Sequence, residues 1–488
     1  MSHPSDITIQ PAPAAWREML ACRAPLDPRA RALREALRLP IDRPVIASGH
    51  QATIWHAGIL AKYLAVAHAC DALGAAPLWV VVDHDPEDFT TLAVPARVPV
   101  PGPSEGASGR LARREVRLVS EEIAALLAAD GAPRAIGPVP IRDPEAALAD
   151  ALAPGHATPA LPGVADAVAG VGRALSDAAA GTTSAAEQVA AATATLIAPI
   201  LEPLKPLPTI MASSLARTEF FGWLVGMMRD EPVACVRAYN AAASAHPDAR
   251  ISPLATRGGG GDAGQGSHAV ELPLWHVRST DPIRRRVWSS DLPGIPRQEL
   301  APRALLLTGL LRLAGCDLFV HGTGGGGADG ASGYDAITDR WLADWLGLPL
   351  APTATVTATL TLPLLDPRAP APTRADAARA RWQAHHARHD GAFLGPGAAQ
   401  AKSAALGVIN ATRDRAARRS AYASMHRVLA DARAARSGAI DELTRKADQA
   451  DALAADADVA RDRTWPFPLH GLESLLAFDR AVRDRFAR

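Results

Sequence analysis

The chain has 488 residues, 48% of them hydrophobic, which is enough for an enzyme-sized core divided among about two to four compact units. Its 51 basic residues equal its 51 acidic residues, so no surplus positive charge is available to neutralise nucleic-acid phosphates. The four cysteines form no CxxC pair, which argues against a disulfide framework or a structural zinc site. No signal-like start and no apolar stretch of about 18 residues occurs. The sequence therefore predicts a cytoplasmic protein with neither nucleic-acid nor membrane partners.

Prolines interrupt the apolar repeats of residues 1–40, which we expect to form an N-terminal arm. The core, predicted for residues 41–365, begins with a short apolar run at 44–47 that stops at the polar residues 48–51. Residues 57–73 then have helical spacing and end before a glycine. This pattern predicts a strand, a turn and a helix.

A second apolar run, residues 77–82, follows that helix and ends in the acidic segment 83–85. A strand, a helix and a strand in succession predict two parallel strands, buried on both faces of a sheet. Segments rich in proline, glycine and alanine predict insertions at about 100–185 and 240–300.

The alternation of strands and helices continues along the chain. Patterns typical of a helix at 184–201 and a strand near 209–212 are followed by an amphipathic helix for which Ser213 or Ser214 is the expected N-cap. A third buried strand, 317–320, leads into a glycine-rich loop and another helix. We therefore predict an α/β fold with a small-molecule site at the carboxyl ends of parallel strands.

The composition changes near residue 366, where alanine, arginine and aspartate dominate. Residues 366–462 contain few prolines and are predicted to form long helices, packed as a hairpin or a coiled coil. Residues 463–488 regain aromatic and leucine side chains. We expect this last segment to dock on the core.

The first candidate site is Ser48-Gly49-His50-Gln51, where free backbone N–H groups and a helix dipole could hold an anion. The alternative is a capped turn with a solvated His50. Lys62 lies in the following helix, where a single lysine is more often solvated than catalytic.

The second candidate is Asp83-His84-Asp85 at the end of the next strand. Such a cluster could bind a divalent cation, orient an amine or act as a general base. Because the carboxyl ends of neighbouring parallel strands share one crevice, His50 could face the same ligand. An acidic loop that only ends the strand is the alternative.

The third candidate is the glycine run 322–327, which satisfies GxGxxG after a strand. No acidic residue ends a following strand at the expected distance and no GK[ST] is present, so neither a nicotinamide dehydrogenase nor a Walker ATPase is predicted. The run could cradle an anion or act as a flexible hinge. Polar residues that could join a site at this strand end are His321, Tyr334, Asp335, Thr338 and Asp339.

Several segments occur in one order along the chain: GHQ ending at residue 51, WHAG with Lys62, VVVDHD ending at 85, FVHGTGG, YDAITD ending at 339, and GLPLAPTATVTATLTLP. Together they resemble the bacillithiol biosynthesis cysteine-adding enzyme family, and most closely its uncharacterised branch. The resemblance implies a nucleotidylyltransferase-like Rossmann fold with insertions, a C-terminal coiled coil and a homodimer. It also implies amide formation between cysteine and a glucosaminyl-malate acceptor. The HxGH spacing of nucleotidylyltransferases is absent, and the glycine loop is longer than in the family.

Our leading hypothesis is an amide-forming ligase that joins cysteine or a similar amino acid to a small amino-sugar-like acceptor, with ATP or ADP as a possible ligand and no predicted metal. In this hypothesis Gly49 binds an anionic group, His50 stabilises negative charge, the 83–85 segment holds or deprotonates the amine, and the glycine loop closes over the ligand. The predicted catalytic residues are His50, Asp83, His84 and Asp85. The predicted substrate-binding residues are Ser48, Gly49, Gln51, Lys62, His321, Gly322, Gly324, Gly325, Tyr334, Asp335 and Asp339.

Two other functions remain open at this point. One is a metal-dependent phosphoesterase that uses the 83–85 segment. The other is a nucleotide- or sugar-binding module without catalysis, whose helical region serves dimerisation.

Overall fold

The computed structural model describes residues 5–23, 25–99, 109–129, 131–257, 269–327, 333–366 and 372–487. It divides into two compact units. The core unit comprises residues 1–94, 114–362 and 463–488, and the helical unit comprises residues 95–113 and 363–462. Residues 100–108 and 258–268, which belong to the two predicted insertions, lie outside the described residues.

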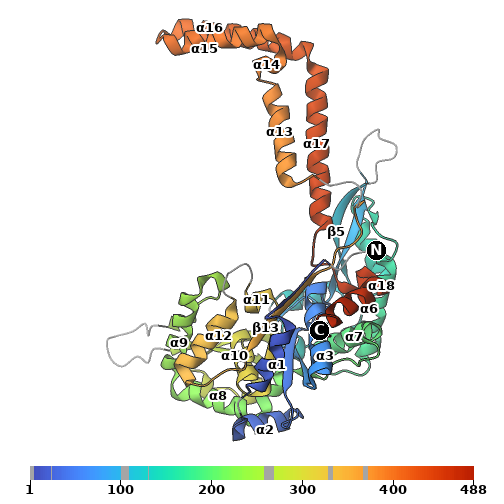
Figure 1. The fold of residues 1–488 in the computed structure, drawn as a ribbon, viewed down its shortest axis with the longest axis vertical. Helices are drawn as coiled ribbons and strands as arrows, with labels where there is room; N and C mark the ends of the chain where they lie inside the picture. Colours follow the sequence, from blue (N-terminus) through green and yellow to red (C-terminus); the bar gives the residue numbers. More distant parts are fainter. Residues whose placement is uncertain are drawn as a thin grey trace. The chain divides into compact units, whose positions relative to one another are not determined.

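A six-stranded sheet forms the centre of the core unit (Figure 1). Its strands, in spatial order, are β1 (Ser5–Gln10), β13 (Thr353–Thr359), β12 (Leu318–His321), β2 (Val45–Gln51), β3 (Ala76–Val82) and β7 (Thr209–Met211). β1 is antiparallel to β13, whereas all other neighbours are parallel. The prediction of an α/β protein with a mostly parallel sheet is therefore confirmed.

The direction of strand addition reverses at the centre of this sheet. β2, β3 and β7 follow one another toward one edge, while β12 and β13 follow one another toward the other. β2 and β12 are neighbours, with Ile46 opposite Leu318. Parallel sheets open a crevice at such a reversal, outside the carboxyl ends of the strands, because the connections on the two sides leave in opposite directions.

Helices cover both faces of the sheet, and successive strand residues are buried on alternate sides. Trp79 and Val81 of β3 join one apolar cluster, while Leu78 and Val80 join the other. The first cluster packs under α3 (Ala57–Leu73), α6 (Val164–Ala179), α7 (Ala185–Leu201) and α18 (Leu472–Arg483). The second packs under α2 (Pro28–Ala36), α8 (Glu219–Asp230), α9 (Pro232–Ala245), α10 (Ala304–Leu310) and α12 (Tyr334–Leu346) (Figure 1).

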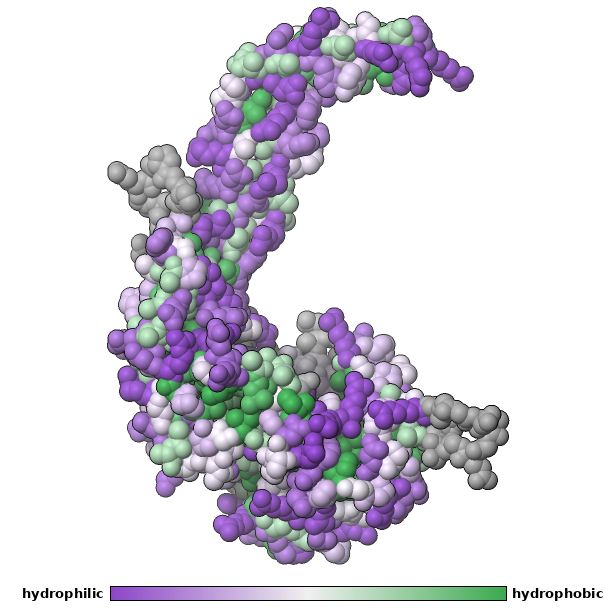
Figure 2. All heavy atoms as spheres, turned by 180° about the vertical axis from the view of Figure 1, so that it is seen from behind, coloured by the Kyte–Doolittle hydropathy of each residue, from purple (hydrophilic) through white to green (hydrophobic). Residues whose placement is uncertain are grey.

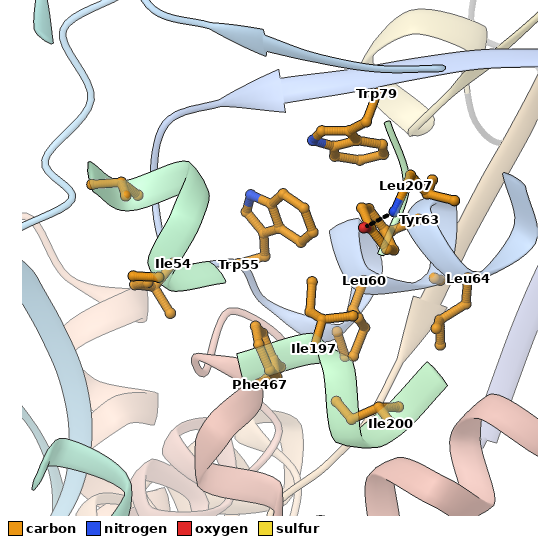
Figure 3. Packing of buried hydrophobic residues seen from close by; sticks show 14 of the residues in the cluster. Ile54, Trp55, Leu60, Tyr63, Leu64, Trp79, Ile197, Ile200, Leu207 and Phe467 are labelled. Atoms are coloured by element: carbon orange, nitrogen blue, oxygen red, sulfur yellow. Dashed lines mark hydrogen bonds between the residues drawn. The ribbon is translucent and has the colours of Figure 1, made fainter. Parts of the chain in front are cut away.

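An aromatic cluster fixes α3 against β3. The centroids of the Trp55, Tyr63 and Trp79 rings are 4.8 to 5.4 Å apart. Figure 3 shows the three rings next to one another among aliphatic side chains. The backbone N–H of Leu207 donates a 2.6 Å hydrogen bond to the Tyr63 hydroxyl. Burial raises the pKa of Tyr63 to about 12, so the hydroxyl stays neutral at physiological pH. The cluster holds α3, and with it Lys62, in one position above the sheet.

The local predictions hold in part. Gly74 ends α3 in the left-handed conformation, with φ of 65°, as its position after the helical pattern predicted. The predicted N-cap of α8 is wrong, because a short helix, η2 (Ala212–Arg217), comes first and Thr218 caps α8. The predicted turn at residues 48–51 is also wrong, since β2 continues through Gln51 and pairs residue by residue with β3.

The predicted insertions contain further secondary structure. A second sheet is formed by β8 (Thr256–Arg257), β9 (Ala269–Arg278), β10 (Asp281–Trp288) and β11 (Leu300–Pro302). Other elements are β4 (Thr91–Val98), β5 (Arg110–Arg117), β6 (Thr158–Pro159), α4 (Glu121–Ala128), η1 (Pro133–Ala135) and α5 (Pro144–Leu152). The N-terminal segment forms β1, α1 (Pro13–Ala21) and α2. β1 is an edge strand of the main sheet.

The C-terminal helical region forms most of the helical unit. Its helices are α13 (Arg374–Ala387), α14 (Gly391–Leu394), α15 (Pro396–Ala411), α16 (Arg415–Ala435) and α17 (Ser437–Ala460). α13 packs against α17, and α15 packs against α16. Their core is thin, and hydrophilic side chains cover most of the surface seen in Figure 2. Trp382 and Tyr422 are 58% and 54% exposed. Among the described helices of the chain, none is both long and apolar enough to span a membrane.

Candidate functional site

A cavity of about 230 Å³ lies where the strand order reverses, at the carboxyl ends of β2, β3 and β12. Predicted site residues from four distant segments line it together: Gly49, His50, Gln51, Lys62, Asp85, His321, Gly322, Gly324, Gly325 and Tyr334. The opposite wall is largely apolar and comes from α10 and from the π turn η6 (Leu311–Gly315). The cavity is smaller than the sites of about 300 to 1,000 Å³ that enclose drug-sized ligands, so it can enclose only the reacting groups of larger substrates.

The segment Ser48 to Gln51 reaches this cavity as the end of a strand. Ser48 is fully buried, and its Oγ donates a 2.6 Å hydrogen bond to the carbonyl of Val320, which ties β2 to β12. A Cβ on Gly49 would lie 2.3 Å from the carbonyl oxygen of Val80, so only glycine fits here. Every residue of this segment pairs with β3, so the segment is a strand and not the turn from which an anion cradle was predicted.

Lys62 is the cation of the cavity. Its side chain is 5% exposed, and its Nζ donates a 2.9 Å hydrogen bond to the carbonyl of Gly49. Burial lowers the pKa of Lys62 from 10.5 to about 8. No carboxylate of the described residues forms an ion pair with it. A buried ammonium without a counter-ion is costly, so an anionic group in the cavity would be strongly favoured.

His50 is a neutral partner beside this lysine. Burial, and then the charge of Lys62, lower the pKa of His50 to about 3. Its Nδ1 lies 3.4 Å from the carbonyl oxygen of Gln51, which can only accept a hydrogen bond. The neutral imidazole of His50 therefore carries its one N–H hydrogen on Nδ1, and its Nε2 can accept a hydrogen bond.

His321 is held between two side chains of α12. Its Nε2 lies 2.8 Å from Oδ1 of Asp335, and its Nδ1 lies 3.2 Å from the hydroxyl of Tyr334. Because a carboxylate only accepts, the imidazole carries its hydrogen on Nε2, and Tyr334 donates to Nδ1. Burial lowers the pKa of His321 although Asp335 opposes this, and burial raises the pKa of the Tyr334 hydroxyl. In the resting site His321 is neutral and Tyr334 is protonated.

The acidic segment after β3 does not converge on one ligand. Asp83 accepts hydrogen bonds from the backbone N–H of Ser213, at 3.0 Å, and from the Ser213 hydroxyl, and it lines a different cavity. Burial alone would raise the pKa of Asp83, but hydrogen bonds from His84 and Ser213 outweigh burial and lower it. His84 is buried, with Nε2 2.8 Å from the carbonyl oxygen of Pro302. Among the predicted catalytic residues, only His50 and Asp85 face the first cavity.

Asp85 is held by two groups at the edge of the first cavity. Arg284 donates a 2.6 Å hydrogen bond to its Oδ1, and Gln51 donates a 3.5 Å hydrogen bond to its Oδ2. Among the described residues, no group of three His, Cys, Asp or Glu side chains is arranged to hold a metal ion.

Two predicted binding residues of α12 have separate positions. Asp335 is buried behind His321 and touches the ligand cavity only through it. Asp339 is 52% exposed and pairs at 2.6 Å with Nη2 of Arg312. Arg312 also approaches Asp335, with 3.9 Å between Nη1 and Oδ1.

Sequence reasoning missed Arg284 and Arg312. Arg284 belongs to β10, and its guanidinium lies 4.4 Å from the centre of the Trp275 ring. Both arginines are distant in sequence from the carboxylates that they contact, so no local pattern marks them.

No protein-family model matches this chain, and no curated protein matches it.

Proposed function

We propose that the first cavity is the active site of an amide-forming ligase of the bacillithiol cysteine-adding type, which joins cysteine or a similar amino acid to a small amino-sugar-like acceptor. The observation that carries this proposal is the convergence of the resembling motifs. GHQ, Lys62, the histidine and glycines of FVHGTGG, and Tyr334 of YDAITD contribute side chains to one cavity. The parallel sheet brings these strand ends together, and the polar side chains that then line the cavity support a ligand site there.

We further propose that the sheet is a Rossmann-like core of the nucleotidylyltransferase type. The parallel strands lie in the order β7, β3, β2, β12 and β13, which is the order that two βαβ halves produce when they start at the same central position. In such cores the ligand binds at the reversal point, where this cavity lies.

In the proposed reaction Lys62 binds a carboxylate of the substrate. Its ammonium has no acidic partner among the described residues, so a carboxylate would supply the missing charge. His50 borders the same space and, as a neutral imidazole, can exchange hydrogen bonds with the substrate without adding a second positive charge. We assign His50 to orientation of the reacting carboxyl group.

The attacking amine must lose a proton as the new C–N bond forms. We assign removal of this proton to the linked side chains of Tyr334, His321 and Asp335, the Tyr334–His321–Asp335 series. The Tyr334 oxygen accepts the amine proton while the hydroxyl proton passes to Nδ1 of His321, 3.2 Å away. Asp335, 2.8 Å from Nε2, stabilises the imidazolium that results. This role replaces the one first assigned to Asp83 and His84, which lie outside the cavity.

Amide formation from a free carboxylate is unfavourable in water, so the carboxyl oxygen must leave on an activating group. We propose ATP as the co-substrate, with the oxygen leaving as phosphate and ADP as the other product. The atoms then balance, because the amine nitrogen replaces the phosphorylated oxygen on the carboxyl carbon.

The other two functions receive less support. A metal-dependent phosphoesterase would need Asp83, His84 and Asp85 to point at one ion, whereas their side chains contact Ser213, Pro302 and Arg284. A binding module without catalysis would have no use for the histidine–carboxylate pair beside the cavity. We propose homodimerisation through the helical unit, supported by the exposed Trp382 and Tyr422.

The proposal is tested by incubating the protein with cysteine, glucosaminyl-malate and ATP and searching for the condensed product by mass spectrometry. We expect product with the parent and at least about a hundredfold less with His50→Ala, since misplacement of the reacting group costs about this much. Cysteine or the acceptor should also raise the melting temperature of the parent and not that of the variant. Phosphate release that depends on Mn²⁺ or Mg²⁺ alone, without condensed product, would instead support the phosphoesterase.

Two adjacent glycines give a matched pair of variants for the Tyr334–His321–Asp335 series. A Cβ on Gly325 would lie 2.4 Å from Nδ1 of His321, whereas a Cβ on Gly324 would come no closer than 3.8 Å to Tyr334. We expect Gly325→Ala to lower kcat about a hundredfold by displacing the imidazole. Gly324→Ala should stay within about threefold of the parent. Equal rates for the two variants would remove His321 from the proposed step.

A further inference from the structure

A second cavity, of about 630 Å³, opens beside the carboxyl ends of β3 and β7. It shares no lining residue with the first cavity. Its walls come from η1, the start of α7, η2 and the end of β9. Hydroxyl groups and arginines dominate its polar lining, among them Ser213, Ser214, Arg134, Arg217 and Arg278.

The carboxylates around this cavity already have donors. Asp83 accepts from the backbone and the hydroxyl of Ser213. Glu187 accepts 2.7 Å hydrogen bonds from both the backbone N–H and the hydroxyl of Thr183. Glu299 lies 2.8 Å from Nε2 of His276. Each of these acids therefore already has a donor of its own, although Oε1 of Glu187 and Oε1 of Glu299 accept no hydrogen bond from a described residue.

Arg278 is paired with Asp281 at 2.9 Å, but the other two arginines have donors to spare. Arg134 uses Nη2 for the carbonyl of Val277, at 2.9 Å, while its Nε and Nη1 have no hydrogen-bond partner among the described residues. Arg217 is exposed and forms neither a hydrogen bond nor an ion pair with any described residue. A cavity with free guanidinium donors and occupied carboxylates favours an oxyanion, to which arginine donates two hydrogen bonds at once.

The turn after β3 separates the two cavities. Asp83 faces the second cavity and Asp85 faces the first, while His84 between them is fixed to the carbonyl of Pro302. The backbone N–H of Arg134 donates a 2.8 Å hydrogen bond to the carbonyl of Asp83. This hydrogen bond ties the backbone of Arg134 to the turn. A group bound to the Arg134 side chain would lie on the side of the turn that faces the second cavity.

From this geometry we infer that the second cavity is a binding site for an anionic small molecule, which it holds through a carboxylate or phosphate group on Arg134 and Arg217. The surrounding hydroxyls of Ser213, Ser214 and Ser279 suit a ligand that also carries hydroxyl groups. This inference goes beyond the proposed amide ligation and holds whether or not the first cavity performs it.

The test uses isothermal titration of the full-length protein with inorganic phosphate and, separately, with malate. We expect at least one of the two anions to bind the parent, and Arg217→Gln to weaken that binding about tenfold, the usual effect of losing a charged hydrogen bond. Arg237→Gln is the matched control, because Arg237 is an exposed arginine that lines neither cavity. It should bind as the parent does. Phosphate binding alone would identify a phosphate-bearing ligand, and malate binding alone a carboxylate-bearing one.

Lys62→Met distinguishes the two cavities in this experiment. Binding that survives in Lys62→Met and weakens in Arg217→Gln supports the second cavity as an anion site. Binding lost in Lys62→Met would place the anion in the first cavity and overturn the inference. Absence of binding by both anions to the parent, or equal affinity in Arg217→Gln and Arg237→Gln, would overturn it as well. Because Arg217 is exposed and unpaired, its replacement leaves the fold intact, which a thermal melt checks.

Discussion

Lys62→Met is expected to abolish the proposed amide formation and to make the folded chain more stable by about 2 kcal/mol at pH 7. Activity is lost because methionine matches the shape of the lysine stem but offers no charge to the substrate carboxylate. Stability rises because burial lowers the pKa of Lys62 from 10.5 to about 8, which means that the folded state disfavours the charged amine. The pKa shift alone corresponds to about 3 kcal/mol, from which loss of the hydrogen bond to Gly49 subtracts about 1 kcal/mol.

The pH dependence of this effect follows from the same pKa values. Below pH 8 the amine is protonated in both the folded and the unfolded chain, so the folded state carries the full cost of the buried charge. Between pH 8 and 10.5 the folded chain releases its proton first, and the cost declines. Urea denaturation should therefore show a stability difference between variant and parent at pH 7 that is nearly absent at pH 10.5. Lys205→Met, at an exposed lysine, is the control and should show no such gain.

A stable but inactive Lys62→Met would mean that the lysine is retained for function at the expense of stability. A variant that keeps the parent rate would contradict the carboxylate-binding role. A variant less stable than the parent at pH 7 would contradict the conclusion that Lys62 lacks a counter-ion.

Gly49→Ala is expected to cost at least about 3 kcal/mol of folding free energy, or to prevent recovery of folded protein. The added Cβ would lie 2.3 Å from the carbonyl oxygen of Val80, in the middle of the sheet. Two central strands would have to separate to admit it, because the obstructing atom belongs to the backbone and cannot rotate away. Urea denaturation of the purified variant measures the loss.

Gly322→Ala provides the matched control for this substitution. Gly322 also borders the first cavity, but a Cβ there would come no closer than 3.9 Å to the Lys62 side chain. Its stability should remain within about 0.5 kcal/mol of the parent. If Gly49→Ala were as stable as Gly322→Ala, the close approach of β2 and β3 at this position would be wrong.

Much of the first cavity was predictable because parallel strands bring their carboxyl ends to one edge. The apolar runs before His50, Asp85 and His321 identified three such ends, and the three side chains do line one cavity. The end of α3 at Gly74 was equally predictable, since helices commonly end at a glycine in the left-handed conformation. These features depend on local patterns and on one general property of parallel sheets.

The remaining features depend on tertiary contacts that no local pattern encodes. The polar residues 48–51 indicated a turn. β2 nevertheless continues through this segment, because each of its residues pairs with a residue of β3. Asp83 and Asp85 were grouped by their proximity in sequence, but β3 ends at Val82 and the chain turns over residues 83–85, so the two side chains face different cavities. Arg284 and Arg312 contact their carboxylates from elements far along the chain, so their positions follow only from the assembled fold.

The three residues after β3 also constrain how such a protein can change during evolution. Asp83 and Asp85 serve different cavities from a single short turn, and His84 fastens the turn to Pro302. Insertion or deletion of one residue would rotate both carboxylates away from their cavities at once. The two cavities can therefore diversify through side-chain replacement, while the length of the turn between them is expected to stay fixed across any descendants that keep both cavities.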